Sequence, residues 1–90
     1  MEFEWDELKN EANKRNHGIS FETAAFVFND ENRIEIYDAF HSKTNDDRYI
    51  TIGKVRKVLY VVFTEREDKI RIISARLAEK KEKEIYYGNS

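Results

Sequence analysis

The chain has 90 residues, 40% of them hydrophobic and 38% charged, with a net charge of −2 at pH 7, so we expect one domain over residues 1–90. It contains no cysteine, which excludes disulfide bonds and thiolate metal ligands. No segment approaches the roughly 18 apolar residues of a membrane helix, and the acidic N-terminus lacks the pattern of a secretion signal, so we expect a soluble cytoplasmic protein.

The N-terminal part of the chain predicts two helices. Asp6 is a favourable N-cap for the first helix, and Gly18 is placed to end it. Ser20 caps a second helix with one apolar face at i, i+3, i+4 and i+7 spacing, formed by Phe21, Ala24, Ala25 and Phe28. Alternation over 33–37 then predicts a short strand, and the polar segment 40–47 predicts a loop.

The C-terminal part predicts an antiparallel meander followed by a helix. From Arg48 the pattern alternates, and Gly53 is interpreted as a bulge or the entry to a turn. The run 58–63 is apolar on both faces, which is typical of a central strand. The remaining elements are expected as a turn over 65–68, a strand over 70–75 and a polar helix over 78–87. The expected fold class is α+β: two N-terminal helices, an antiparallel sheet of three to four strands and a C-terminal helix.

Charge is unevenly distributed along the chain. Residues 1–47 contain 5 Lys or Arg and 12 Asp or Glu, a balance of −7, whereas residues 48–90 contain 11 and 6, a balance of +5. Such asymmetry is typical of a nucleic-acid surface, of a protein that needs a charge-complementary partner, or of two halves that neutralise each other in the fold. A sequence pI near 5.7 argues against nonspecific nucleic-acid binding by the whole surface.

The last predicted strand carries two arginines. Alternation places Ile70 and Ile72 on one face and Arg71 on the other, and Arg76 follows where the chain turns toward the helix. Arginine is costly to bury unless it is paired, so this strand offers its cations to an anion. That anion is either a carboxylate of this protein or a phosphate of another molecule.

Strand geometry separates the arginines into two groups. Arg48 begins one strand and Arg66 ends its antiparallel neighbour, so both should lie near the same end of the sheet. Arg76 is about ten residues from the turn after Arg66, which is on the order of 25 Å or more along a straight strand. We therefore expect one cluster of Arg48 with Arg66, and another of Arg76 with Lys57 and the C-terminal helix.

Several blocks of this chain resemble the BrnT family of type II toxins. They begin at Phe3-Glu4-Trp5-Asp6, follow in order over nearly the whole chain, and are most specific at Ile70-Arg71-Ile72-Ile73-Ser74-Ala75-Arg76. Tyr86 or Tyr87 fills the C-terminal tyrosine of the family. The resemblance implies a ribonuclease toxin with a RelE-like fold. It also implies a ribbon-helix-helix, BrnA-like antitoxin as partner, through which the toxin would contact DNA only indirectly.

Metal-independent RNA cleavage explains which residue types matter. The 2′-hydroxyl attacks the adjacent phosphorus, so one group must take its proton, another must protonate the leaving oxygen, and fixed cations must stabilise the phosphorane. Histidine suits proton transfer and arginine suits phosphate. The catalytic candidates are His17, Arg48, Arg66 and Arg76, and the substrate-binding candidates are His41, Lys57, Arg71 and Tyr86. We expect neither a metal site nor a cofactor.

Each candidate also has a structural interpretation. His17 stands before Gly18, where its cation would meet the dipole at a helix C-terminus. Arg71 would pair across strands or reach solvent, and Arg76 would interact with the acidic N-terminal half. His41 would be an ordinary loop residue, and Tyr86 would be a packing aromatic.

The main prediction is an endoribonuclease toxin that acts on mRNA and blocks translation. The alternative is an inactive toxin-fold module that binds a small antitoxin-like partner. Two departures from the family pattern favour the alternative: Asn16 stands where the family usually has lysine, and Asp46-Asp47 where two glutamates are common.

Overall fold

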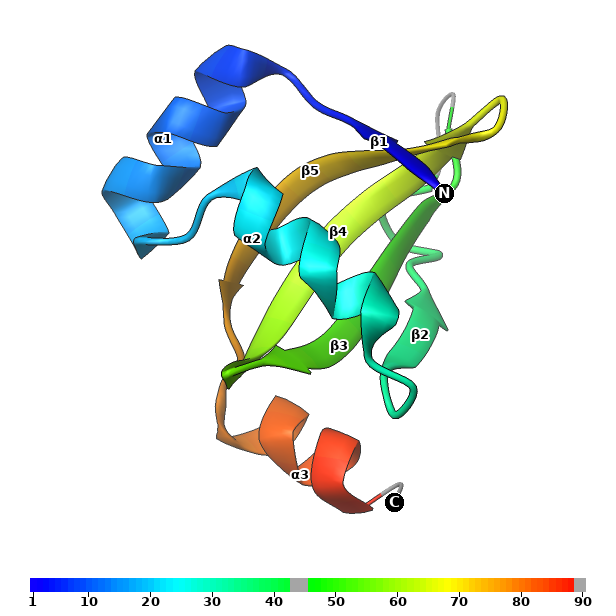
Figure 1. Ribbon diagram of the computed structural model, residues 1–90. Helices are drawn as coiled ribbons and strands as arrows, with labels where there is room; N and C mark the ends of the chain where they lie inside the picture. The colour runs from blue at the N-terminus through cyan, green and yellow to red at the C-terminus, as the bar shows by residue number, and fades with distance from the viewer. Residues whose placement is uncertain (43–45, 89–90) are drawn as a thin grey trace.

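The computed structural model describes residues 1–42 and 46–88, which form three α-helices, a 3₁₀ turn and five strands (Figure 1). In chain order these are β1 (Glu2–Glu4), α1 (Glu7–His17), α2 (Phe21–Ala25), η1 (Phe26–Asn29), β2 (Ile34–Tyr37), β3 (Arg48–Val55), β4 (Lys57–Arg66), β5 (Lys69–Leu77) and α3 (Lys80–Gly88). The α+β class predicted from the sequence is confirmed. None of the described helices is long and apolar enough to cross a membrane.

The sheet has five strands in the order β1-β5-β4-β3-β2. The pairs β2–β3, β3–β4 and β4–β5 are antiparallel. The pair β1–β5 is parallel, with Phe3 opposite Ile70. The expectation of a purely antiparallel sheet of three to four strands was therefore wrong. A three-residue strand is too short to show an alternating pattern, and its pairing joins residues nearly 70 positions apart, so nothing local predicts it.

The helices α1 and α2 cover one face of the sheet, as expected (Figure 1). The predicted caps form: the side chain of Asp6 accepts hydrogen bonds from two backbone N–H groups of α1, and Gly18 has a left-handed φ of 71°. The side chain of Ser20 caps α2. Phe21 and Val27 are fully buried in the core between α2, η1 and the sheet.

Gly53 allows the helical layer to approach the sheet. The expectation of a bulge or turn entry there was wrong, because Gly53 lies inside β3 and pairs with Leu59. A Cβ at this position would lie 2.7 Å from Cγ1 of Val27 and 3.1 Å from Cβ of Arg33. The glycine is therefore required by the close approach of η1 rather than by a turn.

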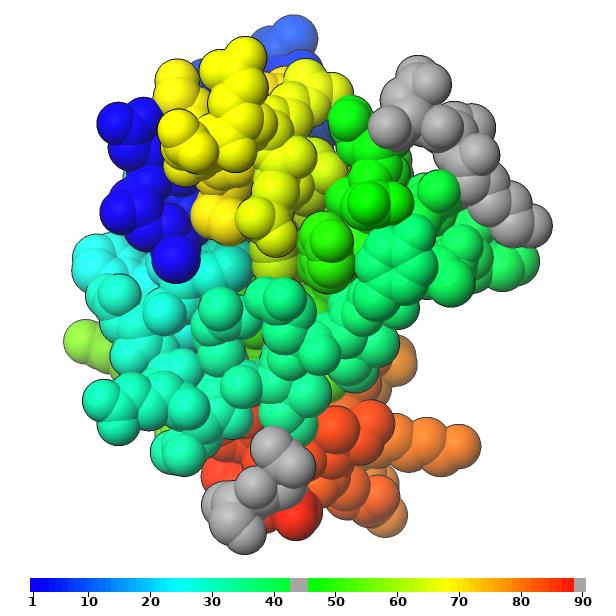
Figure 2. All heavy atoms as spheres, turned by 90° about the vertical axis from the view of Figure 1, so that its right-hand side faces the viewer, coloured from blue at the N-terminus to red at the C-terminus, as the bar shows by residue number. Residues whose placement is uncertain are grey.

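The opposite face of the sheet is covered at one end only. There Tyr86 of α3 and Ala78, which precedes this helix, pack with Ile52 and Val58, close to the β3–β4 turn. The β4–β5 hairpin and α3 lie at opposite ends of the molecule (Figures 1 and 2). The sheet face beside the hairpin is therefore left open by α3.

One predicted connection differs from its expected bounds, and another is described only in part. The turn expected over 65–68 is shorter, because β4 continues to Arg66 and Glu67 takes a positive φ of 56° at the turn. The loop expected over 40–47 includes residues 43–45, which lie outside the described residues.

Candidate functional site

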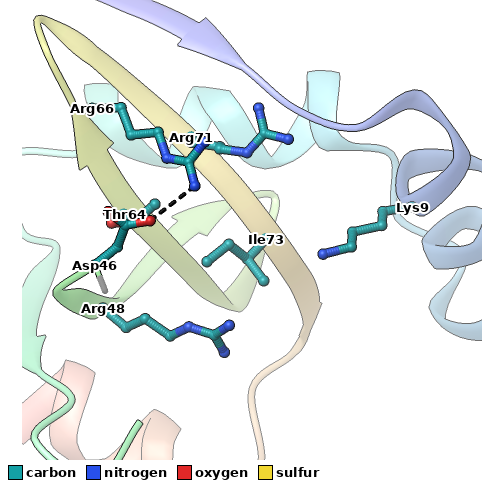
Figure 3. Close-up of a pocket in the computed structure, with 7 residues that line it drawn as sticks. All are labelled: Lys9, Asp46, Arg48, Thr64, Arg66, Arg71 and Ile73. Carbon is teal, nitrogen blue, oxygen red and sulfur yellow. Dashed lines mark hydrogen bonds and ion pairs between the residues drawn. The ribbon is translucent and has the colours of Figure 1, made fainter. Parts of the chain in front are cut away.

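A basic hollow of about 230 Å³ lies on the open end of the sheet (Figure 3). Its lining comes from α1, the segment before β3, and strands β3, β4 and β5, and consists of Lys9, Asp46, Arg48, Thr64, Arg66, Arg71 and Ile73. Strand register sets Arg48 opposite Thr64 and Thr64 opposite Arg71, so these three side chains form one row across the sheet. Figure 3 shows the Lys9 amine extending from α1 toward Ile73.

The cations of the hollow differ in their partners. Arg66 donates to the carboxylate of Asp46 at 2.8 Å, and Arg71 donates to Glu4 of β1 at 3.1 Å. Among the described residues, no carboxylate pairs with the guanidinium of Arg48 or the amine of Lys9. These two charges are therefore available to an external anion.

Two partly buried hydrogen bonds fix the segment that carries Asp46 and Arg48. The buried hydroxyl of Thr64 donates to the carbonyl of Asp47 at 2.6 Å. The backbone N–H of Arg48 donates to the hydroxyl of Ser42 at 2.8 Å. Both contacts hold the start of β3 against its neighbours, so the hollow has a defined edge.

A β-bulge places two arginines of β5 on the same face. The register between β4 and β5 shifts at Val62, so that Ile73 is the extra residue. Before the bulge Ile72 is buried and Arg71 faces the open side; after it Ala75 is buried and Arg76 faces the open side. Uninterrupted alternation would have put these two arginines on opposite faces.

Arg76 nevertheless binds α3 and does not line the hollow. Its guanidinium makes two 2.8 Å hydrogen bonds to the carboxylate of Glu82 and lies 3.9 Å from the ring centroid of Tyr60. The hydrogen bond to Glu82 raises the pKa of Arg76 and lowers the pKa of Glu82. The expected interaction of Arg76 with the acidic N-terminal half was therefore wrong, because its partner is in the C-terminal helix.

His41 pairs with a carboxylate beside the hollow. Its Nδ1 lies 2.8 Å from Oδ2 of Asp38, whose backbone N–H donates to the carbonyl of Arg48 at 2.9 Å. Partial burial raises the pKa of Asp38, but hydrogen bonds from the side chain and backbone of His41 outweigh it and hold that pKa below its usual value. His41 does not line the hollow itself.

Three other candidates lie away from the hollow. His17 is the last residue of α1 and lines a separate concavity with Lys57, near the β3–β4 turn. Tyr86 is the buried residue of α3, where its hydroxyl donates to Asp30 at 2.6 Å, and this hydrogen bond with burial raises the pKa of Tyr86 to about 12. The structure thus gathers Arg48, Arg66 and Arg71 and separates them from these three.

Sequence reasoning did not identify Lys9, Thr64 or Ile73 as site residues. Thr64 could have been found from strand register, since it stands opposite Arg48. Lys9 could not, because its place depends on how α1 docks beside β5. Among residues 1–42 and 46–88, no three His, Asp or Glu side chains gather as a set of metal ligands.

The sequence of the chain matches the model of the ribonuclease toxin BrnT of type II toxin-antitoxin systems over residues 5–82. The chain belongs to the BrnT family. Among solved structures it resembles the crystal structure of the Brucella abortus ribonuclease toxin BrnT, with a TM-score of 0.62 and 25% sequence identity over 89% of this chain and 99% of that chain. No curated protein sequence matches this chain.

Membership of the BrnT family confirms the family predicted from the sequence blocks. The family is one of ribonuclease toxins, and a type II toxin implies a protein antitoxin. All seven residues that line the hollow fall within the matched range of residues 5–82. Glu4, which pairs with Arg71, and Tyr86 fall outside it.

Proposed function

We propose that this BrnT-family chain is an endoribonuclease whose basic hollow holds the phosphate that is cleaved. The observation that carries this proposal is the row of Arg48, Thr64 and Arg71 across three strands, with the guanidinium of Arg48 unpaired among the described residues. Such a hollow suits a phosphate group, because each guanidinium group can donate two parallel hydrogen bonds to phosphate oxygens and keeps its charge.

The reaction begins with attack of the ribose 2′-oxygen on the adjacent phosphorus. A bond from this oxygen to phosphorus forms, the bond from phosphorus to the 5′-oxygen breaks, and the products are a 2′,3′-cyclic phosphate and a 5′-hydroxyl. Negative charge builds on the phosphorane oxygens in between, where Arg48 and Lys9 stabilise it. The ion pairs to Asp46 and Glu4 restrain Arg66 and Arg71, so their guanidinium groups are already positioned when the substrate binds.

The Asp38–His41 pair is our candidate for proton transfer: the Nε2 of His41 takes the proton of the 2′-hydroxyl as its oxygen bonds to phosphorus, and the imidazolium gives a proton to the 5′-oxygen as that oxygen leaves. Imidazole exchanges protons near neutral pH, and a carboxylate bound to Nδ1 favours the tautomer whose Nε2 is basic. Backbone hydrogen bonding ties Asp38 to Arg48, at the edge of the hollow. His17, the other histidine, lies with Lys57 at the β3–β4 turn and has no part in this assignment.

The partner and the cellular target also remain proposals. The resemblance noted above supports a ribbon-helix-helix antitoxin as the protein that neutralises this chain, and mRNA as its target, with translation blocked as a result. DNA would be contacted through the antitoxin only. Arginines provide the charge stabilisation in this mechanism, so cleavage is expected to continue without divalent metal.

The test is incubation of the purified chain with 5′-labelled RNA in EDTA. The proposal expects fragments that end in a 2′,3′-cyclic phosphate. Intact RNA from folded protein would instead support the inactive toxin-fold module, which one observation favours: Arg66 and Arg71 already have carboxylate partners within the chain. Fragments with 3′-hydroxyl ends would contradict attack by the 2′-oxygen.

A further inference from the structure

A second basic surface lies around the β3–β4 turn, at the far end of β4 from the hollow (Figure 1). It consists of two concavities of about 360 and 530 Å³, which adjoin because Arg56, Lys57 and Leu77 line both. The first also includes residues of the α1–α2 connection, and the second includes residues of α3. We call this the hairpin surface.

The hairpin surface is cationic at its walls and apolar at its floor. Five basic residues and no described acidic residue line it, and the basic residues are His17, Lys54, Arg56, Lys57 and Lys83. Its floor includes the core residues Ile19 and Leu59, and Leu77 remains 47% exposed beside them. The hollow differs, because Ile73 is its only aliphatic lining residue and a carboxylate is already present in it.

Arg56 occupies the tip of this surface in an unfavourable conformation. Val55 pairs with Lys57, so Arg56 alone makes the turn, with a left-handed φ of 64°. Glycine or asparagine is the usual residue in that conformation. The turn thus presents a guanidinium at a position where backbone geometry favours a small side chain.

We propose that the hairpin surface docks an acidic amphipathic segment of a protein partner. Carboxylates on such a segment would meet the four lysine and arginine cations, while an aliphatic side chain would cover Leu77 and the apolar floor, which matches the apolar centre and polar rim of protein interfaces. Single-stranded RNA binds through phosphates and through stacking of bases on aromatic rings. Among the described residues, Tyr87 is the one Phe, Tyr or Trp that lines this surface, and its ring already lies edge-on to the ring of Tyr86 and beside the amine of Lys54. The aliphatic floor contributes nothing to stacking, so the surface suits a peptide better than a run of bases. The proposal rests on the protein antitoxin of the family but not on RNA cleavage.

The test measures fluorescence anisotropy of a labelled synthetic helix of about 18 residues, with leucines at i, i+3, i+4 and i+7 and glutamates elsewhere. A scrambled peptide of the same composition is the control ligand. We expect the amphipathic peptide to bind more tightly than the scrambled one, and Arg56→Asn and Leu77→Ser each to weaken it roughly tenfold. Asparagine tolerates the left-handed conformation, so Arg56→Asn removes the charge without adding strain.

Two further variants serve as matched controls. Arg56→Lys keeps the charge and should retain affinity, and Lys80→Gln removes a cation of α3 that does not line the surface. Any of three results would overturn the proposal: the amphipathic peptide does not bind, the scrambled peptide binds equally well, or the affinity is unchanged in both Arg56→Asn and Leu77→Ser. A single-stranded RNA could also compete with the peptide. If that competition is weakened by Arg56→Asn and unchanged by Leu77→Ser, the surface binds nucleic acid, and the proposal is overturned as well. Because no RNA cleavage is measured, these outcomes are independent of the proposed ribonuclease activity.

Discussion

At the scale of single residues, the arginines of this chain differ in what holds them. Arg66, Arg71 and Arg76 each have one carboxylate partner, in the segment before β3, in β1 and in α3 respectively. The sequence expectation that Arg71 pairs across strands is met by its ion pair with Glu4, directly opposite in the β1–β5 register. Among the four candidate arginines of the site, Arg48 stands apart, because no described carboxylate neutralises it.

Gly53 gives a prediction about stability at this scale. Gly53→Ala would place a Cβ 2.7 Å from Val27, so η1 must shift or the strand must distort. We expect the free energy of unfolding to fall by about 1–3 kcal/mol, measured by urea denaturation. The matched control is Gly88→Ala, where a Cβ would meet nothing within 4 Å. Equal stability of the two variants would show that the helical layer does not depend on the glycine.

Asp38 gives a prediction about activity. Asp38→Asn keeps the size of the side chain but removes the charge that holds His41, so we expect RNA cleavage to slow by at least about tenfold while the fold persists. Circular dichroism would check the fold, and single-turnover cleavage would give the rate. An unchanged rate would remove the Asp38–His41 pair from the proposed proton transfer.

At the scale of elements, two polar contacts hold α3 besides its apolar face, one to β5 and one to the connection between η1 and β2. Arg76 binds Glu82 near the start of α3, and Tyr86 binds Asp30 near its end. Burial raises the pKa of Asp30, but hydrogen bonds from Tyr86 and from the backbone of Asn32 and Lys54 hold it lowered overall. Both contacts bridge segments that are distant in the fold from the hollow.

The Tyr86 contact predicts a pH dependence of stability. Tyr86 has a pKa of about 12 in the folded chain against 10.0 ordinarily, so its hydrogen bond stabilises fully below pH 10 and is lost as pH rises toward 12. Tyr86→Phe should lower the free energy of unfolding by about 1–2 kcal/mol at neutral pH and flatten its decline between about pH 10 and 12. Urea denaturation across that pH range would measure both. The same slope in both proteins would contradict this role of Tyr86.

The elements also show what local sequence can and cannot predict. The helix ends at Asp6, Gly18 and Ser20 could be predicted from the sequence, since a cap depends on residues that are neighbours in the chain. The hairpin pairing of Arg48 with the end of β4 followed from strand lengths. The β5 bulge and the parallel β1 did not follow, because both are set by contacts between segments far apart in sequence. The bulge decides which face receives Arg76, so the site could be located only in part.

At the scale of the whole molecule, the acidic and basic halves are partly paired in the fold. Glu4 binds Arg71, Asp46 binds Arg66, and Asp30 accepts from the backbone of Lys54. Basic residues that these contacts leave unpaired gather at both ends of β4, in the hollow and on the hairpin surface. Neutralisation within the fold and attraction of an external anion therefore apply to different residues.

This arrangement predicts how RNA binding depends on salt. If about three phosphate contacts form in the hollow, the logarithm of the binding constant should fall with the logarithm of salt concentration with a slope of about −2. Arg48→Gln should reduce the magnitude of that slope by about 0.7, since one contact is lost. Titration of a short single-stranded RNA at several salt concentrations would measure it. A slope near zero would mean that the hollow does not bind phosphate.

The most direct test of the proposed site compares single-turnover RNA cleavage by Arg48→Gln and Arg76→Gln, at a temperature where circular dichroism shows both variants folded. The two arginines lie on the same face, but one lines the hollow and the other binds Glu82 of α3. We predict that Arg48→Gln slows cleavage by about a hundredfold or more, while Arg76→Gln stays within about tenfold of the unsubstituted chain. Loss of cleavage in Arg76→Gln with full activity in Arg48→Gln would contradict the account and place the site beside α3.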